Sequence, residues 1–209
     1  MIVLALDTTL DACQCALVSE GEALAVMSEP MVRGHQERLA GMVAETMAHA
    51  RLDFAAIDQL AVTVGPGSFT GLRVGLAFAK GLAMALSRPL AGVGTLEAFC
   101  AGVAGLSASV IDAGRGRIYL QVFEDGAALD EPQILLLEEG ASRLRERAAG
   151  RNGALTGPGA HWLADAFPSF TLMPLSAPNP CAIAVIALAR PRPATPLYLR
   201  PPDARPHRP

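Results

Sequence analysis

The sequence predicts an α/β protein with two similar halves, each a mixed β-sheet with helices on its faces. Three observations support this prediction. Three strands open the chain in succession, alternating helices and strands follow them, and a second, weaker pass of the same kind begins near residue 107. We therefore divide the chain into residues 1–104, residues 105–190 and a tail of residues 191–209.

The first three strands are predicted from their hydrophobic patterns and from the turns between them. Residues 2–6 (IVLAL) are a continuous apolar run, residues 12–19 alternate, and residues 23–29 form a third strand. Residues 7–11 and the Glu-Gly-Glu of residues 20–22 supply the turns. This order predicts an antiparallel meander.

After the third strand, the spacing of apolar residues changes from every second residue to the period of a helix. Over residues 35–50, Leu39, Met42, Val43 and Met47 fall on one helical face. The remaining predicted elements of this half are a strand at 60–64, a helix from 68 or 70 to 86, a strand at 90–93 and a helix at 95–103. This is half of a ribonuclease H-like layout.

The second pass shows weaker patterns. Residues 107–112 (SASVID) and 117–124 read as strands joined by a glycine-rich turn, and a last helix is predicted at about 179–190. The twenty residues from Arg190 onward contain seven prolines and five arginines. They predict an extended segment that is either strapped to the protein or loose.

Composition limits the class of protein. The 209 residues are 51% hydrophobic and carry a formal net charge of −3, so no global positive field attracts a polyanion such as RNA. The N-terminus has no basic leader, and the apolar run at 74–86 is interrupted by Lys80 and is short for a membrane span. Four cysteines without paired spacing favour reduced thiols. These features predict a cytoplasmic protein without a membrane partner.

The stretch VGPGSFTGLR contains three glycines but matches none of the common phosphate-loop or nucleophile patterns. No lysine stands where a P-loop needs one, Gly71 comes one residue late for the dinucleotide pattern, and Ser68 lacks the flanking glycines of a hydrolase elbow. What remains is a tight turn at Gly65, Pro66 and Gly67 and a helix N-terminus. Its amides can receive an anion, or a hydroxyl side chain can cap it.

The helix that follows carries small residues at every fourth position, namely Gly71, Gly75 and Ala79, with Arg73 and Lys80 nearby. A smooth stripe of this kind lets another helix approach closely. The approaching helix can belong to this chain or to a second one. We interpret the stripe as a contact surface.

Four polar residues are candidates for nucleotide contact. Asp7, Thr8 and Thr9 follow the first strand, and Asp112 follows the equivalent strand of the second half. The competing interpretation of the first three is a hairpin turn capped by its own side chains.

Two further polar features are predicted to be structural. His35 has no second histidine one turn later, so no metal site is expected there, and Cys13 and Cys15 fall on one face of a strand, which predicts core packing. The chain shows no Ser/His/Asp or Cys/His set that would mark a catalytic centre.

The segments IVLALDTTLDACQCAL, RGHQERL, VGPGSFTGLRVGLAFAKGLA, DAGRGRIY and PLYLRPPDA together resemble the TsaB (YeaZ) family. The resemblance implies an actin-like ATPase fold and a cytoplasmic partner subunit in making threonylcarbamoyladenosine on tRNA. It also implies pairing with the catalytic paralogue TsaD, joined by the ATPase TsaE, with tRNA met only through the complex. The resemblance further implies that the subunit has no cofactor of its own and that ATP or ADP can bind at the level of the complex.

In that family the helices equivalent to residues 35–50 and 70–86 build the intersubunit bundle, which also permits a homodimer. The residues that the resemblance assigns to this interface are His35, Leu39, Met42, Gly71, Arg73, Gly75 and Ala79.

Two departures from related patterns qualify the resemblance. TsaD-like proteins carry a metal-binding His-x-x-x-His where this chain has Thr95 and Phe99, so the resemblance implies no metal and no catalytic residue here. Gly114 and Arg117 replace an arginine and a glutamate of the usual TsaB turn. The alternative function is an autonomous actin-like ATPase or kinase-like enzyme that uses Asp7 and Asp112.

Overall fold

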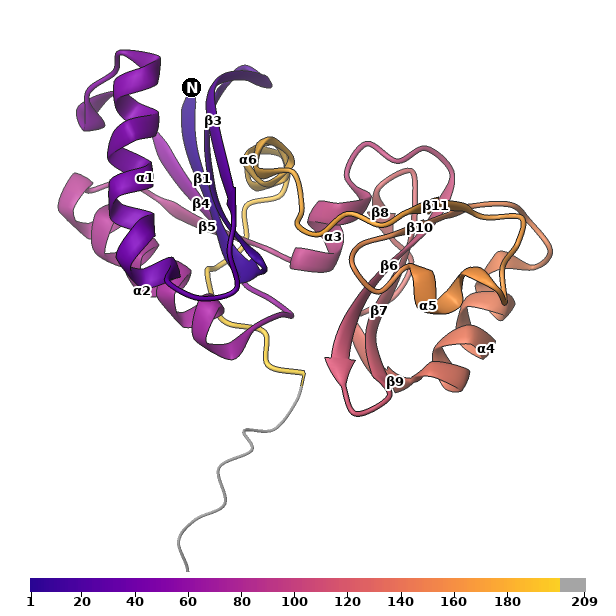
Figure 1. Ribbon diagram of the computed structural model, residues 1–209. Coiled ribbons are helices and arrows are strands. Elements are labelled where there is room, and N and C mark those ends of the chain that lie inside the picture. The colour runs from indigo at the N-terminus through magenta and orange to yellow at the C-terminus, as the bar shows by residue number, and fades with distance from the viewer. Residues whose placement is uncertain (200–209) are drawn as a thin grey trace, which may run out of the picture.

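The computed structural model describes residues 1–199 and contains two mixed sheets that lie side by side (Figure 1). In the first sheet β1 pairs antiparallel with β2 and parallel with β4, which gives the order β3-β2-β1-β4-β5. Its strands are β1 (Ile2–Leu10), β2 (Ala12–Ser19), β3 (Glu22–Pro30), β4 (Gln59–Thr63) and β5 (Leu90–Val93). The predicted meander is confirmed, and β1 continues through the residues expected to turn.

Helices α1 (His35–Ala50) and α2 (Phe69–Leu86) lie together on one face of this sheet (Figure 1). A short 3-10 turn, Phe54–Ala56, leads from α1 to β4. The side chains of β1 alternate, so Leu4 and Leu6 meet the two helices while Val3 and Ala5 point to the opposite face. The core on this side is completed by Leu39, Met42, Val43 and Met47 of α1 and by Leu72, Leu76, Ala79 and Ala83 of α2.

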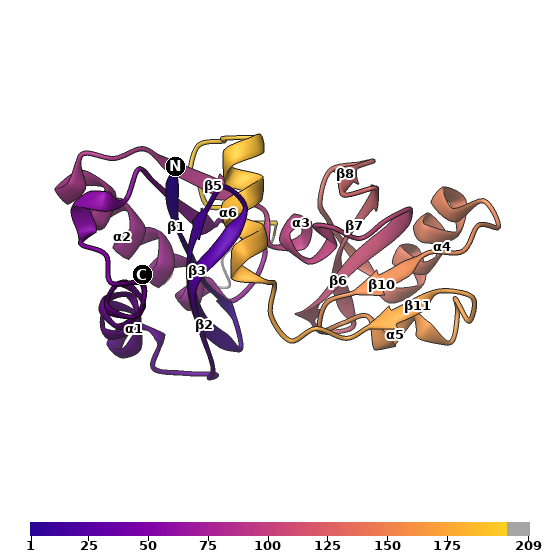
Figure 2. The ribbon, with the colours of Figure 1, turned by 90° about the horizontal axis from the view of Figure 1, so that it is seen from above.

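The opposite face of the first sheet is covered by α6 (Pro180–Ala189), which lies between the two sheets in Figure 2. Ile183, Ala184, Ile186 and Ala187 form one cluster with the β1 and β2 side chains. The sequence assigns residues 105–190 to the second half, whereas α6 packs into the first. Helix α6 is strongly apolar, and packing against the apolar face of the first sheet buries most of its apolar surface.

Residues 190–199, which we call the C-terminal strap, continue along the first half. Gly92 N donates to Arg192 O at 2.8 Å, and Leu197 N donates to Val64 O at 2.7 Å. Of the two interpretations of the tail, the strapped one describes this part. Residues 200–209 lie outside the described residues.

The second sheet repeats the arrangement of the first. A meander of β6 and β7 with β8 or β9 is extended by the parallel strands β10 and β11. Its strands are β6 (Leu106–Gly114), β7 (Arg117–Glu124), β8 (Ala127–Ala128), β9 (Gln133–Leu136), β10 (Ala154–Thr156) and β11 (Thr171–Met173). The prediction of two mixed-sheet halves is confirmed.

The faces of the second sheet are also covered by helices. Helices α4 (Leu137–Ala148) and α5 (His161–Ala164) bury one face, and α3 (Thr95–Cys100) packs its Leu96 and Phe99 against the other. Helix α3 therefore lies between the halves (Figure 2). It ends three residues before the predicted end.

Candidate functional site

Asp7 is fully buried, and its carboxylate is held by side chains and backbone of its own half. Its Oδ1 accepts hydrogen bonds from Thr9 N at 3.0 Å, Thr9 Oγ1 at 2.6 Å and Thr63 Oγ1 at 2.6 Å, and its Oδ2 accepts from Gln14 Nε2 at 3.3 Å. A buried carboxylate is stable only with such donors. The donors here belong to the fold itself, so no ligand is needed to satisfy Asp7.

The turn after β4 is closed onto the end of β1. Gly65 has a φ of 100°, which glycine adopts readily, and its peptide bond to Pro66 is cis. Ser68 N donates to Thr9 O at 2.7 Å, and a Cβ on Gly67 would overlap that carbonyl. The Ser68 hydroxyl in turn accepts from Gly71 N at 3.3 Å and caps α2. One amide of this helix N-terminus, that of Gly71, is thus capped by the chain itself.

The small-residue stripe of α2 meets β1 rather than another helix. Thr8 Oγ1 donates to Gly71 O at 2.7 Å, and a Cβ on Gly71 would overlap the Thr8 carbonyl. A Cβ on Gly75 would lie 2.5 Å from Thr8 Oγ1, and Ala79 is fully buried. The Asp-Thr-Thr turn and the glycine stripe, two separate motifs in the sequence, are therefore the two sides of one contact.

Most residues of the predicted partner interface lie inside the first half, and the interface itself stays a prediction. Of the residues assigned to it, only Arg73 is exposed; the others are His35, Leu39, Met42, Gly71, Gly75 and Ala79, and all are buried within the first half. His35 Nε2 lies 3.1 Å from Leu10 O, so this histidine also serves internal packing. A buried stripe cannot receive a second chain.

A different set of small residues faces outward from the same two helices. On α1 these are Ala40, Gly41, Ala44 and Ala48, and on α2 they are Thr70, Ala77, Gly81 and Ala85. Large apolar side chains flank them, since Phe69 is 48% exposed and Met84 is 81% exposed. We call this surface the α1–α2 outer face.

The α1–α2 outer face is hollowed between the helices. A groove of about 570 Å³ is lined by Gln36, Leu39, Phe69, Thr70, Arg73, Val74, Ala77 and Phe78. Within the described part of the chain, α2 is also the one helix whose length and composition would allow it to cross a membrane. Core helices of globular proteins pass the same test, and α2 buries one face against the sheet.

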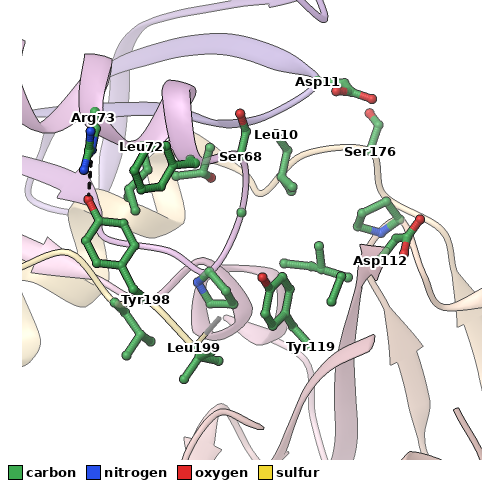
Figure 3. Close-up of a pocket in the computed structure, with 18 residues that line it drawn as sticks. Leu10, Asp11, Ser68, Leu72, Arg73, Asp112, Tyr119, Ser176, Tyr198 and Leu199 are labelled. Atoms are coloured by element: carbon green, nitrogen blue, oxygen red, sulfur yellow. Dashed lines mark hydrogen bonds between the residues drawn. The ribbon is translucent and has the colours of Figure 1, made fainter. Parts of the chain in front are cut away.

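A second, larger pocket of about 850 Å³ lies between the two halves (Figure 3). At one end the Arg73 guanidinium stacks over Phe69 at 3.8 Å, and Arg73 Nε donates to the Tyr198 hydroxyl at 3.3 Å. The Phe69 and Tyr198 rings are 5.5 Å apart. Asp112 lines this pocket and accepts from Gly114 N at 2.6 Å, whereas Asp7 is not among its lining residues. Thr9, also a predicted nucleotide contact, lines the pocket together with Asp112, and nucleotide binding stays a prediction.

The helix that replaces the His-x-x-x-His segment is part of the core. Thr95 and Phe99 are buried, and Thr95 Oγ1 donates to Thr9 Oγ1 at 3.3 Å. Between them, the buried Glu97 carboxylate is paired with Arg190 at 3.6 Å and with Arg192 of the strap. Among residues 1–199, no group of three or more His, Cys, Asp or Glu side chains is placed to hold a metal ion.

The cysteines contribute to packing. Cys13, Cys15 and Cys100 are buried and Cys181 is partly exposed. Burial raises the pKa of Cys13 to about 12 and that of Cys15 to about 11, so neither thiol ionises near neutral pH.

Residues 26–133 match the family model of TsaD, tRNA N6-adenosine threonylcarbamoyltransferase. An uncharacterized protein of Mycobacterium tuberculosis is 34% identical over 98% of this chain and 94% of its own length. The tRNA threonylcarbamoyladenosine biosynthesis protein TsaB of Escherichia coli is 36% identical over 57% of this chain and 53% of its own.

A solved structure, YeaZ of Pseudomonas aeruginosa, superposes with a TM-score of 0.79 at 28% identity, covering 95% of this chain and 99% of the other. The chain belongs to the TsaB (YeaZ) family. TsaB membership places it among proteins of tRNA threonylcarbamoyladenosine biosynthesis. The more distant component A of (R)-2-hydroxyglutaryl-CoA dehydratase from Acidaminococcus fermentans, 12% identical with a TM-score of 0.54 over 91% of this chain and 98% of the other, shares the actin-like ATPase fold alone.

Sequence reasoning missed three features of this TsaB-family site. They are the outward small-residue set on α1 and α2, the pocket between the halves, and the pairing of Glu97 with the strap. The first had a signal in the sequence, since Ala77, Gly81 and Ala85 also recur every four residues. The other two join segments far apart in the chain and leave no local pattern.

Proposed function

We propose that this protein is a non-catalytic partner subunit required for threonylcarbamoyl transfer to the adenosine beside the anticodon of tRNA. It scaffolds and activates a TsaD-type catalytic subunit, a TsaE-type ATPase joins the pair, and tRNA is met through the complex in the cytoplasm. Family membership supports the pathway, and the absence of the His-x-x-x-His pair at Thr95 and Phe99 supports a catalytic centre on the partner.

The observation that carries the partner role is the α1–α2 outer face. Helices approach closely where side chains are small, and shape complementarity rather than charge then supplies the contact. Here Ala40, Ala44, Ala77 and Gly81 leave both helix backbones accessible, and the exposed Phe69 offers a large apolar anchor beside the groove. This surface fits a helix pair of the partner better than it fits a nucleic acid.

The proposal is tested by the variant Ala77→Glu. Ala77 is exposed in the isolated chain, so the fold tolerates the change, but a docked helix would bury the new carboxylate without a counter-charge. An unpaired buried charge costs about 2–5 kcal/mol, so the dissociation constant for a TsaD-type subunit from the same organism should rise about 30-fold or more. Calorimetry measures it, and formation of modified tRNA by the reconstituted complex should fall in parallel.

The matched control is Ser142→Glu on α4, which places the same charge on an exposed position of the second half. It should bind the partner like the unmodified chain. If Ala77→Glu also binds unchanged while circular dichroism shows a normal fold, the outer face is not the interface. The same face is proposed to pair two copies of this chain when the partner is absent, and Ala77→Glu should then sediment as a monomer.

A further inference from the structure

The pocket between the halves has walls that are mainly apolar and two ends of opposite charge. Its walls include Leu10, Pro66, Leu72, Ile111, Pro158 and Leu199. Figure 3 shows Arg73 and Tyr198 at one end, and Asp11, Asp112 and Ser176 at the other. Both aspartates are exposed, and they come from different halves, Asp11 from the β1–β2 turn and Asp112 from β6.

This chemistry disfavours a phosphate-bearing ligand. Asp7 accepts four hydrogen bonds within its own half, and the Ser68 amide donates to Thr9 O. Among residues 1–199, Arg73 is the cationic residue that lines the pocket, and it stacks on Phe69 and donates to the Tyr198 hydroxyl. Two carboxylates at the far end would repel phosphate and attract an ammonium or guanidinium group instead.

The pocket adjoins the α1–α2 outer face. Phe69 and Arg73 line both the groove between the helices and the pocket between the halves. A partner seated on the helices would therefore lie next to the pocket, with Phe69 and Arg73 between the two. Apolar walls together with an acidic end suit an extended polypeptide segment that carries an apolar side chain next to a lysine or arginine.

We propose that the interlobe pocket binds such a basic, apolar segment of the same partner that docks on the α1–α2 outer face. The inference rests on the proposed function and extends it from a helix contact to a second contact point. In the complex the segment passes the Phe69–Arg73–Tyr198 cluster and sets its cationic group against Asp11 and Asp112. Because these aspartates belong to different halves, the bound segment also fixes the halves relative to each other.

The first experiment removes the two charges with Asp11→Asn and Asp112→Asn in one variant. Asparagine retains an oxygen acceptor for Gly114 N, so the turn after β6 keeps its hydrogen bond. Exposed charge pairs are individually weak, so affinity for the TsaD-type subunit should fall about tenfold and depend less on salt. The control variant Glu138→Gln with Glu146→Gln changes net charge equally on α4 and should bind normally.

The second experiment places the photo-cross-linking residue p-benzoylphenylalanine at Ser176, which is exposed at the acidic end of the pocket. In the assembled complex it should label a segment of the partner containing lysine or arginine, and the same residue at Ser142 should not. The proposal is overturned if the double variant binds normally, or if cross-links stay within this chain, including its own residues 200–209. Normal binding of the Ala77→Glu variant to the TsaD-type subunit would instead refute the proposed function itself.

Discussion

Replacing Gly75 by alanine tests whether the α2 stripe is an internal contact. The new Cβ would lie 2.5 Å from Thr8 Oγ1 and 3.6 Å from Val62 Cγ2. Real Cβ atoms do not approach that closely, so either Thr8 must rotate or α2 must move away from β1. Gly81 lies on the same helix, is exposed, and has nothing within 4 Å of its Cβ position, so Gly81→Ala is the matched control.

The two variants share one energetic effect and differ in another. Alanine is favoured over glycine inside a helix by about 1 kcal/mol, so Gly81→Ala should raise the free energy of unfolding by about 0.5–1 kcal/mol. Gly75→Ala gains the same amount but overpacks the core at a cost of about 1–3 kcal/mol. It also displaces the Thr8 hydroxyl from Gly71 O, a hydrogen bond worth about 1 kcal/mol. The difference between the two variants should therefore be about 2–4 kcal/mol.

Urea denaturation followed by far-UV circular dichroism measures this difference, provided that the m-values agree. Adding Thr8→Ala to the Gly75→Ala variant removes the atom that the new Cβ would meet, so the double variant should be more stable than the sum of the single changes. Equal stabilities of Gly75→Ala and Gly81→Ala would refute the contact. So would a Gly75→Ala variant that folds normally and loses only its binding partner.

Two further predictions concern bound nucleotide and thiol chemistry. The Asp7 carboxylate already accepts four hydrogen bonds within its own half, so millimolar Mg-ATP should leave the melting temperature of the isolated chain unchanged. A nucleotide site filled at 100 times its dissociation constant would add about 2.7 kcal/mol to the free energy of unfolding. A clear rise in the melting temperature would therefore favour the autonomous-ATPase alternative. A thiol reagent at pH 8 should label Cys181 in the native protein and reach Cys13, Cys15 and Cys100 only on unfolding. Labelling of the native Cys181→Ser variant would contradict the burial of the other three thiols. Burial raises the pKa of Cys13 to about 12 and that of Cys15 to about 11. The stability that these two thiols contribute is therefore complete below about pH 9 and is lost as the pH rises through those pKa values.

Much of the fold follows from periodicity. The helix at 35–50 and the strands at 90–93 and 117–124 have the bounds expected from their patterns, because each presents a clear apolar face or run. The end of β1 was harder to predict. Asp7 looks like a turn residue, yet it continues the strand because Thr9, Thr63 and Gln14 satisfy its carboxylate.

The position of the partner surface could not be predicted from α2 alone. Helix α2 carries small residues on two faces, with Gly71, Gly75 and Ala79 on one face and Ala77 and Gly81 on the other. A helical period gives the faces but not which of them meets the sheet. The face with Gly71 packs against β1, where Thr8 donates a hydrogen bond to Gly71 O. Thr8 and Gly71 are more than sixty positions apart, so no local pattern in the sequence indicates this contact.

The path of the chain also fixes the order in which the protein can fold during synthesis. The sheet that opens the sequence stays bare on one face until α6 has been made, and its β5 edge stays open until Arg192 and Pro193 follow. A nascent chain leaving the ribosome must therefore complete the second sheet before its first sheet can close. Premature termination anywhere before α6 should therefore leave an aggregation-prone apolar face exposed.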